Sequence, residues 1–140
     1  MISLQIVNFL EHQAAIQLVR LTVFTDEQGV DPALDLDGQD EAASQILVLD
    51  KDKPVATGRM LTDGHIGRIA VLAEYRKLGI GSRIIDSFIS QARSDGLTKV
   101  FLGAQVSAAP FYKTLGFHRY GDDYMEANIK HTPMQLMLDI

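Results

Sequence analysis

The stretch 75-YRKLGIGSRI-84 decides how this chain folds and what it can bind. Three cations surround two glycines that are spaced two residues apart: Arg76, Lys77, Arg83, Gly79 and Gly81. The residues that follow are apolar at helical spacing, which predicts that a helix begins within the stretch. A helix N-terminus presents unpaired N–H groups that attract anions, and glycine lets an anion approach the backbone closely. The stretch therefore predicts a binding site for a diphosphate.

Two common nucleotide-binding motifs are excluded. A dinucleotide fingerprint needs a third glycine three residues after the second, and position 84 is Ile. A P-loop needs GxxxxGK followed by Ser or Thr, which the chain lacks. The remaining pattern is Arg-x-x-Gly-x-Gly at the start of a helix, and for this hexamer alone an ordinary glycine-rich helix entry stays an alternative.

The segments around the stretch predict a mixed layer of strands and helices. A helix runs from about Ile80 to the breaker Gly96, with one apolar stripe made by Ile80, Ile84, Ile85, Phe88, Ile89 and Ala92. Before the stretch, apolar runs predict strands at 44–50, 55–61 and 65–72. After it, the continuous apolar run at 99–104 predicts a buried central strand.

The remaining segments complete a single domain over residues 1–140. They are a strand at 2–7, a helix at 10–24, a short helix after the cap Ser107 that ends at Gly116, and strands at 117–125 and 133–138. The buried face of the 10–24 helix is predicted to carry Leu10, Ala14, Leu18 and Leu21. This order predicts the α/β class, with a mixed sheet and no regular βαβ repeat.

Composition narrows the possible functions. The chain has 140 residues, a formal charge of −5 and no cysteine, which argues against nucleic-acid binding, disulfides and thiolate chemistry. No apolar run approaches the roughly 18 residues that span a bilayer, and the N-terminus does not resemble a signal peptide, so no membrane association and a cytoplasmic location are expected.

An acidic segment occupies residues 21–50, where Lys and Arg are absent. It is either a solvated loop or a wall that attracts a cationic substrate, and the sequence leaves both open. Asp35, Asp37 and Asp40 have the spacing of a calcium loop, but position 46, where such a loop needs Glu, is Ile. No metal site is predicted.

Four segments, in order along the chain, resemble the GNAT superfamily of acyl-CoA N-acetyltransferases. R76-K-L-G79-I-G81 resembles the superfamily's [Q/R]-x-x-G-x-[G/A] signature, and AQVSAAPFYKTLGF at 104–117 resembles its later strand–helix segment. VFTDEQGV at 23–30 and MEANIKHTPM at 125–134 resemble the YjcF-like or ElaA-like branch. One departure is Gln45, which stands where the branch pattern has His.

The resemblance implies a fold and a co-substrate. The fold is a central, mostly antiparallel sheet that splays between its fourth and fifth strands and is flanked by helices. Acetyl-CoA would lie in the splay, so coenzyme A binding is expected without a metal. The residues implied for this are Ile69, Ala70, Val71, Arg76, Lys77, Leu78, Gly79, Ile80, Gly81 and Ser82.

The resemblance also implies residues for the chemistry. Tyr112, the Tyr of the FY-x-x-LGF motif, is the candidate general acid, and its alternative role is to fill the core. Glu27 is the candidate base acting through water, and otherwise a residue that orients the loop. Gln28 and His131 are candidates for the acceptor side, although a histidine in such a position is more commonly a buried structural residue.

The function implied is that of a transferase, an N-acetyltransferase. It would carry acetyl from acetyl-CoA to a primary amine by direct attack in a ternary complex. The acceptor is a small molecule or a peptide, which the acidic segment favours as cationic, and a homodimer stays open. The alternative is a non-catalytic acyl-CoA sensor, against which Tyr112 argues because a pure binder needs no proton donor.

Overall fold

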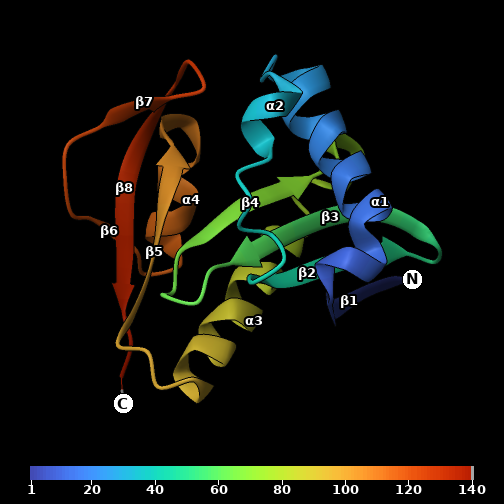
Figure 1. Ribbon diagram of the computed structural model, residues 1–140. Helices are drawn as coiled ribbons and strands as arrows, with labels where there is room; N and C mark the ends of the chain where they lie inside the picture. The colour runs from blue at the N-terminus through green and yellow to red at the C-terminus, as the bar shows by residue number, and fades with distance from the viewer. Residues whose placement is uncertain (140) are drawn as a thin grey trace.

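The computed structural model describes residues 1–139 and shows two antiparallel sheets side by side (Figure 1). The first sheet has the order β1 (Ile2–Val7), β2 (Ser44–Asp50), β3 (Lys53–Met60) and β4 (Ile66–Val71). The second sheet has the order β5 (Lys99–Gln105), β8 (Ile129–Met137) and β6 (His118–Arg119), and β7 (Tyr124–Glu126) also pairs with β8.

Within residues 1–139, a single isolated bridge links the backbones of the two sheets, between the residue before β4 and β5. His65 and Phe101 form a single parallel bridge, and the Phe101 N–H donates to the Gly64 carbonyl over 3.1 Å. Gly64 has a φ of +94°, and a Cβ there would lie 2.7 Å from the Lys99 carbonyl, so only glycine fits this junction. Beyond the bridge β4 and β5 do not pair. The predicted fold class, an antiparallel sheet splayed between its fourth and fifth strands, is confirmed.

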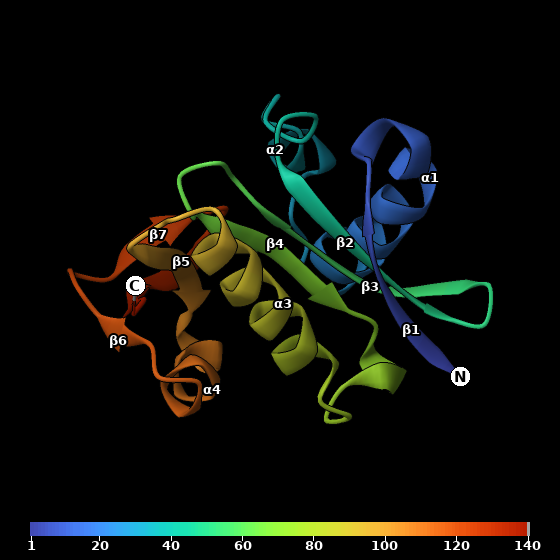
Figure 2. The same cartoon turned by 90° about the horizontal axis from the view of Figure 1, so that it is seen from below.

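Helices cover both faces of the first sheet (Figures 1 and 2). One face carries α1 (Phe9–Arg20), the π-helix η1 (Leu21–Glu27) and α2 (Pro32–Asp35). The other face carries α3 (Ile80–Ser94), which follows the 3₁₀ turn η2 (Ala73–Tyr75). In the second half of the chain, the 3₁₀ turn η3 (Val106–Ala108) leads from β5 into α4 (Ala109–Thr114).

The predicted stripe of α3 forms the centre of the main core. All six of its residues are buried, as the 3.6-residue period predicts, and Ile84, Ile85 and Phe88 are fully enclosed. This packing presses α3 against β3 and β4. The N-terminus of α3 is thereby held beside the gap between the sheets.

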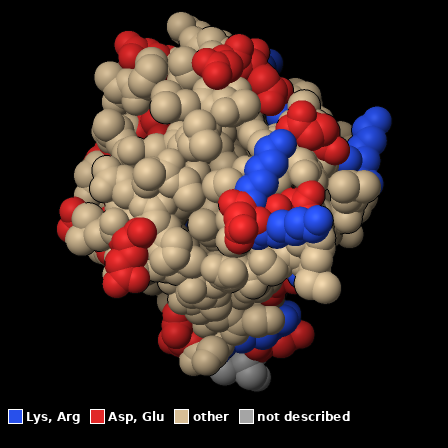
Figure 3. Space-filling model, turned by 90° about the vertical axis from the view of Figure 1, so that its right-hand side faces the viewer, with Lys and Arg blue, Asp and Glu red and all other residues tan. Residues whose placement is uncertain are grey.

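The predicted buried face of the first helix is wrong. Leu10, Leu18 and Leu21 are exposed, whereas Ile16 and Val19 are buried. The segment carries two apolar stripes. The stripe with Ile16 and Val19 packs inward, on the same side as the buried Arg20, which pairs with Asp40. The helix is also not continuous to residue 24, since a π-helix replaces it from Leu21. Figure 3, which views the side of the molecule on which α1 lies, shows a broad uncharged area with charges mainly at its edges.

The C-terminal hairpin also differs from its prediction. The last strand begins at Ile129, not at residue 133, because Ala127 and Asn128 both adopt left-handed φ values (51° and 63°) that close a tight turn with β7. Ser107 does not cap α4, whose N-cap is Ala108 without a side-chain hydrogen bond.

Candidate active site

β4 carries a bulge beside the gap between the sheets. Two residues of β4, Arg68 and Ile69, face the single residue Gly58 of β3. Arg68 accordingly takes a left-handed φ of 51°. A Cβ at Gly58 would lie 2.6 Å from Cδ1 of Ile69, so glycine lets the bulged strand pack closely. A bulge of this kind bends its strand and re-aims side chains, and here it does so on the wall of a cavity.

A cavity of about 720 Å³ lies between the two sheets, a volume typical of ligand pockets. It is lined by β4, β5, the beginning of α3, part of α4, the end of η1 and the β7–β8 hairpin. Eight of the ten predicted cofactor-binding residues line it: Ile69, Val71, Arg76, Lys77, Gly79, Ile80, Gly81 and Ser82. Ala70 does not, because its side chain is buried in the core, and the side chain of Leu78 is exposed outside the cavity lining.

The beginning of α3 is open to a ligand. Gly79 occupies the N-cap position with a left-handed φ of 82°, and no side chain caps the helix. A Cβ built at Gly79 meets nothing within 4 Å, so this part of the turn faces open space. A Cβ at Gly81 would lie 3.5 Å from Phe111, which is ordinary contact. An uncapped helix start with this much free space fits an anionic group such as a diphosphate.

Arg76 is already engaged on the protein side. Its Nη2 donates to Glu27 over 2.8 Å, and its Nε donates to the carbonyl of Val71 over 3.0 Å. Glu27 is not among the residues that line the cavity. Glu27, the predicted base, therefore lies outside the cavity lining and is paired with the turn that leads into α3. Its partner Arg76 ties that turn to the end of β4.

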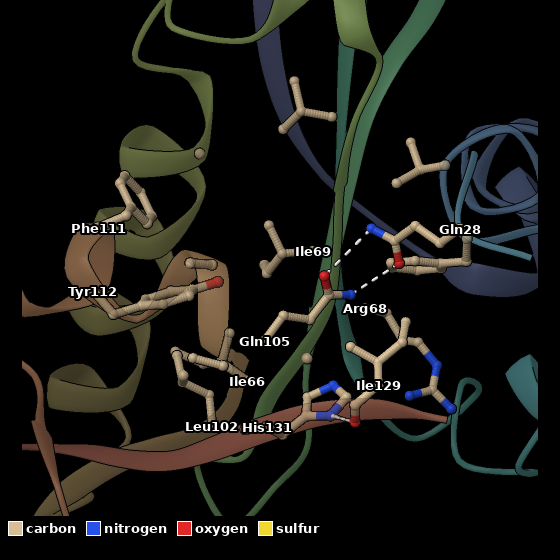
Figure 4. A pocket seen from close by; sticks show the side chains of 18 of the residues that line it. Gln28, Ile66, Arg68, Ile69, Leu102, Gln105, Phe111, Tyr112, Ile129 and His131 are labelled. Carbon is tan, nitrogen blue, oxygen red and sulfur yellow. Dashed lines mark hydrogen bonds between the residues drawn. The ribbon is translucent and has the colours of Figure 1, made fainter. Parts of the chain in front are cut away.

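Tyr112 projects into the cavity from α4 (Figure 4). Its ring packs edge-on against Phe111 and Phe117, with ring centroids 5.0 and 5.8 Å away. Burial raises the pKa of Tyr112 to about 12. Burial is the sole cause of this raised pKa, with no contribution from a hydrogen bond within residues 1–139, and the hydroxyl is directed toward Ile69 and Gln105 in Figure 4. A neutral phenol with a free O–H is thus held in the cavity.

Three polar side chains form a row across the second sheet. Gln105 of β5 and Tyr124 of β7 are both directly opposite His131 of β8, on its two edges. Directly opposite residues point to the same face of a sheet, and all three line the cavity. We call Gln105, His131 and Tyr124 the polar row. Only His131 was predicted from the sequence, where it was placed before the last strand and not inside it.

The hydrogen bond of His131 sets its protonation pattern. Nδ1 lies 2.7 Å from the carbonyl oxygen of Ile129, which can only accept, so Nδ1 carries the proton. In the neutral ring Nε2 then has a free lone pair, and its nearest carboxylate oxygen, on Glu126, is 4.0 Å away. The ring of Tyr124 stacks on the imidazole, with centroids 5.6 Å apart and 19° between the planes. His131 is therefore a fixed imidazole with one free nitrogen.

Gln28, the other predicted acceptor-side residue, crosses the gap to the second sheet. Its carboxamide oxygen accepts from Nε2 of Gln105 over 2.9 Å, and its own Nε2 donates back over 3.4 Å (Figure 4). We call Gln28 and Gln105 the carboxamide pair. Gln105 was not predicted, although its position at the end of a buried strand inside the matched segment was an available signal.

Most of residues 26–42 of the acidic segment are exposed, but the segment does not present an open acidic wall to the cavity. Three of its carboxylates pair with arginines of α1, β3 and β4: Asp35, Asp37 and Asp40 with Arg20, Arg59 and Arg68. Within this cluster, the guanidinium of the buried Arg20 donates two hydrogen bonds to the Asp40 carboxylate, over 2.8 and 3.0 Å. Gln45, which stands where the branch pattern has His, also donates to Asp40. It does not line the cavity, so this difference from the branch pattern lies away from the site.

Burial raises the pKa of Asp40, but hydrogen bonds and charge from Arg20 and Arg59 outweigh it and lower the pKa below its usual value. The hydrogen bond from Arg59 likewise lowers the pKa of Asp37. Both carboxyls therefore stay ionised and paired. Among residues 1–139, no group of His, Cys, Asp or Glu is arranged to hold a metal ion. None of the helices in that range is long and apolar enough to cross a membrane.

Comparison with known proteins agrees with this geometry. Residues 5–138 match the family model of the acetyltransferase (GNAT) domain. The chain is 37% identical to Bacillus subtilis YyaT over 122 residues, which cover 83% of this chain and 82% of YyaT. It is 34% identical over 125 residues to YjcF of the same organism, described as an uncharacterized N-acetyltransferase, with 86% and 88% of the two chains covered.

Solved structures share the fold. Escherichia coli ElaA superposes with a TM-score of 0.85 at 27% identity, covering 97% of this chain and 99% of ElaA. An acyl-CoA N-acyltransferase from Pseudomonas aeruginosa superposes with a TM-score of 0.84 at 22% identity, covering 97% and 99% of the two chains. The chain therefore belongs to the GNAT acetyltransferase family and is an acyltransferase.

Proposed function

We propose that the protein transfers acetyl from acetyl-CoA to a primary amine by direct attack in a ternary complex. One observation supports this proposal: the uncapped start of α3, the Tyr112 hydroxyl and the polar row line one cavity. A helix start suited to a diphosphate thus shares one cavity with two groups that can donate or accept protons, Tyr112 and His131. Such a combination suits acyl transfer between two bound substrates.

Acetyl-CoA would be bound mainly by backbone groups of the protein. The amides from Lys77 to Ser82 would bind the diphosphate, and Gly81 offers its backbone without an intervening Cβ. Beyond the bridge at His65, β4 is the end strand of its sheet, and Ile69 and Val71 line the cavity from that edge. Their backbone groups would pair with the pantetheine arm, and a nearby N–H would polarise the thioester carbonyl. When bound, acetyl-CoA supplies an activated acyl group.

The attacking amine must lose a proton, and His131 is suited to take it. Nε2 has its lone pair free because the carbonyl of Ile129 already takes the Nδ1 proton. As the amine nitrogen bonds to the thioester carbon, its proton moves to Nε2 and the carbon–sulfur bond breaks. We assign this role to His131 and not to Glu27, because Glu27 is paired with Arg76 and lies outside the cavity lining.

Tyr112 would stabilise the departing sulfur. Its pKa of about 12 lies well above that of an ordinary thiol, about 8.5, so complete proton transfer to a solvated thiolate would cost about 5 kcal/mol. A hydrogen bond that tightens as negative charge develops on sulfur avoids that cost. Tyr112 would therefore act as a hydrogen-bond donor that keeps its proton, and the thiolate would take up a proton from solvent after it leaves, while His131 releases the amine's proton to solvent.

The test is thiol release. Purified protein is mixed with acetyl-CoA and a panel of monoamines, diamines, amino acids and lysine peptides, and free thiol is followed over time. Saturable release that depends on the amine supports the proposal. Tight binding of acetyl-CoA without turnover on any amine would favour the alternative, a non-catalytic acyl-CoA sensor, and failure to bind acetyl-CoA would overturn both.

A further inference from the structure

The cavity has few carboxylates for a site that must receive an amine. Among residues 1–139, only two of those that line it carry carboxylates, Asp35 and Glu126. Asp35 is already paired with Arg68 at 3.0 Å and with Arg20 at 3.6 Å. Glu126 has a side chain that is 62% exposed to solvent. The cavity therefore offers no buried, unpaired carboxylate to a cationic nitrogen.

The carboxamide pair offers neutral acceptors instead. Each carboxamide oxygen has two lone pairs, and the reciprocal hydrogen bonds between Gln28 and Gln105 use one on each oxygen. The second lone pair of each oxygen is free to accept from an amine N–H. The two side chains also fix one another, because neither can rotate without breaking the pair. The pair is thus a preorganised neutral seat for a nitrogen with several N–H groups.

The pair is next to the groups that would carry out the reaction. Gln105 is directly opposite His131 in the β5–β8 ladder, which places the two side chains on the same face within about 5.5 Å at Cβ. In Figure 4 the carboxamide of Gln105 lies between Tyr112 and Gln28, above the imidazole of His131. An amine that donates to Gln28 and Gln105 would have Nε2 of His131 beside it.

Much of the lining of the cavity that contains the pair is aliphatic. Side chains of several aliphatic residues line the same cavity: Val30, Leu34, Leu61, Ile66, Leu102 and Ile129. A hydrocarbon body would be desolvated favourably against them, whereas a second ammonium group would lose water without gaining a counter-charge.

We propose that Gln28 and Gln105 form the binding seat of the acceptor nitrogen, and that the acceptor is a monoamine with an apolar body. This inference rests on the proposed function for the identity of the reaction, but the seat can be tested without turnover. It replaces the cationic acceptor that the acidic segment suggested, because Asp35, the one aspartate of that segment that lines the cavity, is already paired with arginines.

The experiment compares 1-aminopentane with 1,5-diaminopentane, which differ by one ammonium group on the same chain. Binding of each amine to the protein saturated with CoA is measured by calorimetry. The wild type is expected to bind 1-aminopentane at least tenfold more tightly than the diamine. Equal or tighter binding of the diamine, or no binding of 1-aminopentane, would overturn the inference.

Two variants test the residues themselves. Gln105→Leu and Gln28→Leu should each weaken 1-aminopentane binding about tenfold while leaving CoA binding and the melting temperature unchanged. Gln28 is exposed, so its variant should fold even if Gln105→Leu does not. Gln13→Leu, on the exposed surface of α1 and away from the cavity lining, is the matched control and should bind as the wild type does.

The outcomes separate the two proposals. Unchanged binding of 1-aminopentane by both Gln28→Leu and Gln105→Leu would overturn the seat and leave acetyl transfer standing. Loss of binding in both variants, together with no thiol release by the wild type from acetyl-CoA and bound 1-aminopentane, would support the seat and count against acetyl transfer.

Discussion

Nδ1 of His131 donates a hydrogen bond to the backbone carbonyl of Ile129 over 2.7 Å, inside a strand and facing a cavity. Because a carbonyl can only accept, this single contact selects the tautomer whose free nitrogen is Nε2. The tight turn at Ala127 and Asn128 brings Ile129 into position for it. The imidazole proposed as general base is thus oriented by backbone, and the Glu126 carboxylate lies 4.0 Å from its Nε2.

Removing this base should slow the reaction without weakening cofactor binding. We expect His131→Gln to lower kcat/KM for the amine about 100-fold, since proton transfer by a positioned side chain contributes 10² to 10⁴ in rate. Thiol release at varied amine concentration measures kcat/KM, and calorimetry should find acetyl-CoA binding unchanged. An unchanged kcat/KM in His131→Gln would contradict the role of base.

Glu27→Gln is the matched comparison for His131→Gln. Its carboxylate binds Arg76 over 2.8 Å outside the cavity lining, so its loss should alter the position of the turn before α3. We expect KM for acetyl-CoA to change and kcat to stay within about threefold of the wild type. A large fall in kcat with an unchanged KM would return the role of base to Glu27.

Tyr112→Phe separates catalysis from packing. No hydrogen bond within residues 1–139 contributes to the raised pKa of the hydroxyl, so its loss should change the free energy of unfolding by less than about 1 kcal/mol. The ring contacts with Phe111 and Phe117 remain. We expect kcat to fall about 10²-fold or more at unchanged KM for acetyl-CoA, and unchanged turnover would assign Tyr112 to the core alone.

The raised pKa of Tyr112 makes a further prediction about pH. A phenol donates only while protonated, and a pKa of about 12 extends its protonated range upward from the ordinary value of about 10. Turnover should therefore show no loss from this group up to about pH 10.5. Stability that depends on the neutral phenol is fully present below pH 10 and is lost as the pH rises toward 12. A rate that falls with an apparent pKa near 9 to 10, and loses this limb in Tyr112→Phe, would show that the phenol titrates normally.

Replacing the two glycines of the 75–84 stretch by alanine should have different effects, on stability at Gly79 and on acetyl-CoA binding at Gly81. Gly79→Ala forces a Cβ into the left-handed region at φ 82°, which costs about 1–2 kcal/mol of stability even though the space is open. Gly81→Ala places its methyl group 3.5 Å from Phe111, an ordinary contact, so the melting temperature should not change. In Gly81→Ala we expect weaker acetyl-CoA binding, measured by calorimetry, because the methyl group would occupy the approach of the diphosphate.

The arginine–aspartate cluster should make the fold sensitive to acid. The folded-state pKa values of Asp37 and Asp40 are lowered, so their contribution is present above the ordinary carboxyl pKa of 3.8 and is lost as pH falls below it. Asp40→Asn should lower the free energy of unfolding by about 3–5 kcal/mol at pH 7, because it leaves Arg20 buried and poorly compensated. Denaturant titrations at pH 7 and pH 3.5 measure this, and the difference between wild type and variant should shrink at the lower pH. A difference that is equal at both values would show that the pair does not stabilise through its charge.

The sequence by itself determined the elements whose signals are local. The period of Ile84, Ile85 and Phe88 gave α3 its buried face, and the glycines of the 75–84 stretch predicted an open helix start, since both effects depend on neighbours along the chain. The order of strands and the four matched segments were enough to indicate the family and the splayed sheet.

Only the tertiary structure decided which of the two apolar stripes of α1 is buried. The buried stripe lies beside Arg20, whose partner Asp40 is 20 positions further along the chain, and such a contact cannot be read from local spacing. The carboxamide pair and the polar row could not be read from the sequence for the same reason. Gln28 and Gln105 are 77 positions apart, and their contact exists only because the two sheets diverge from a common junction and leave a gap that long-range packing holds open.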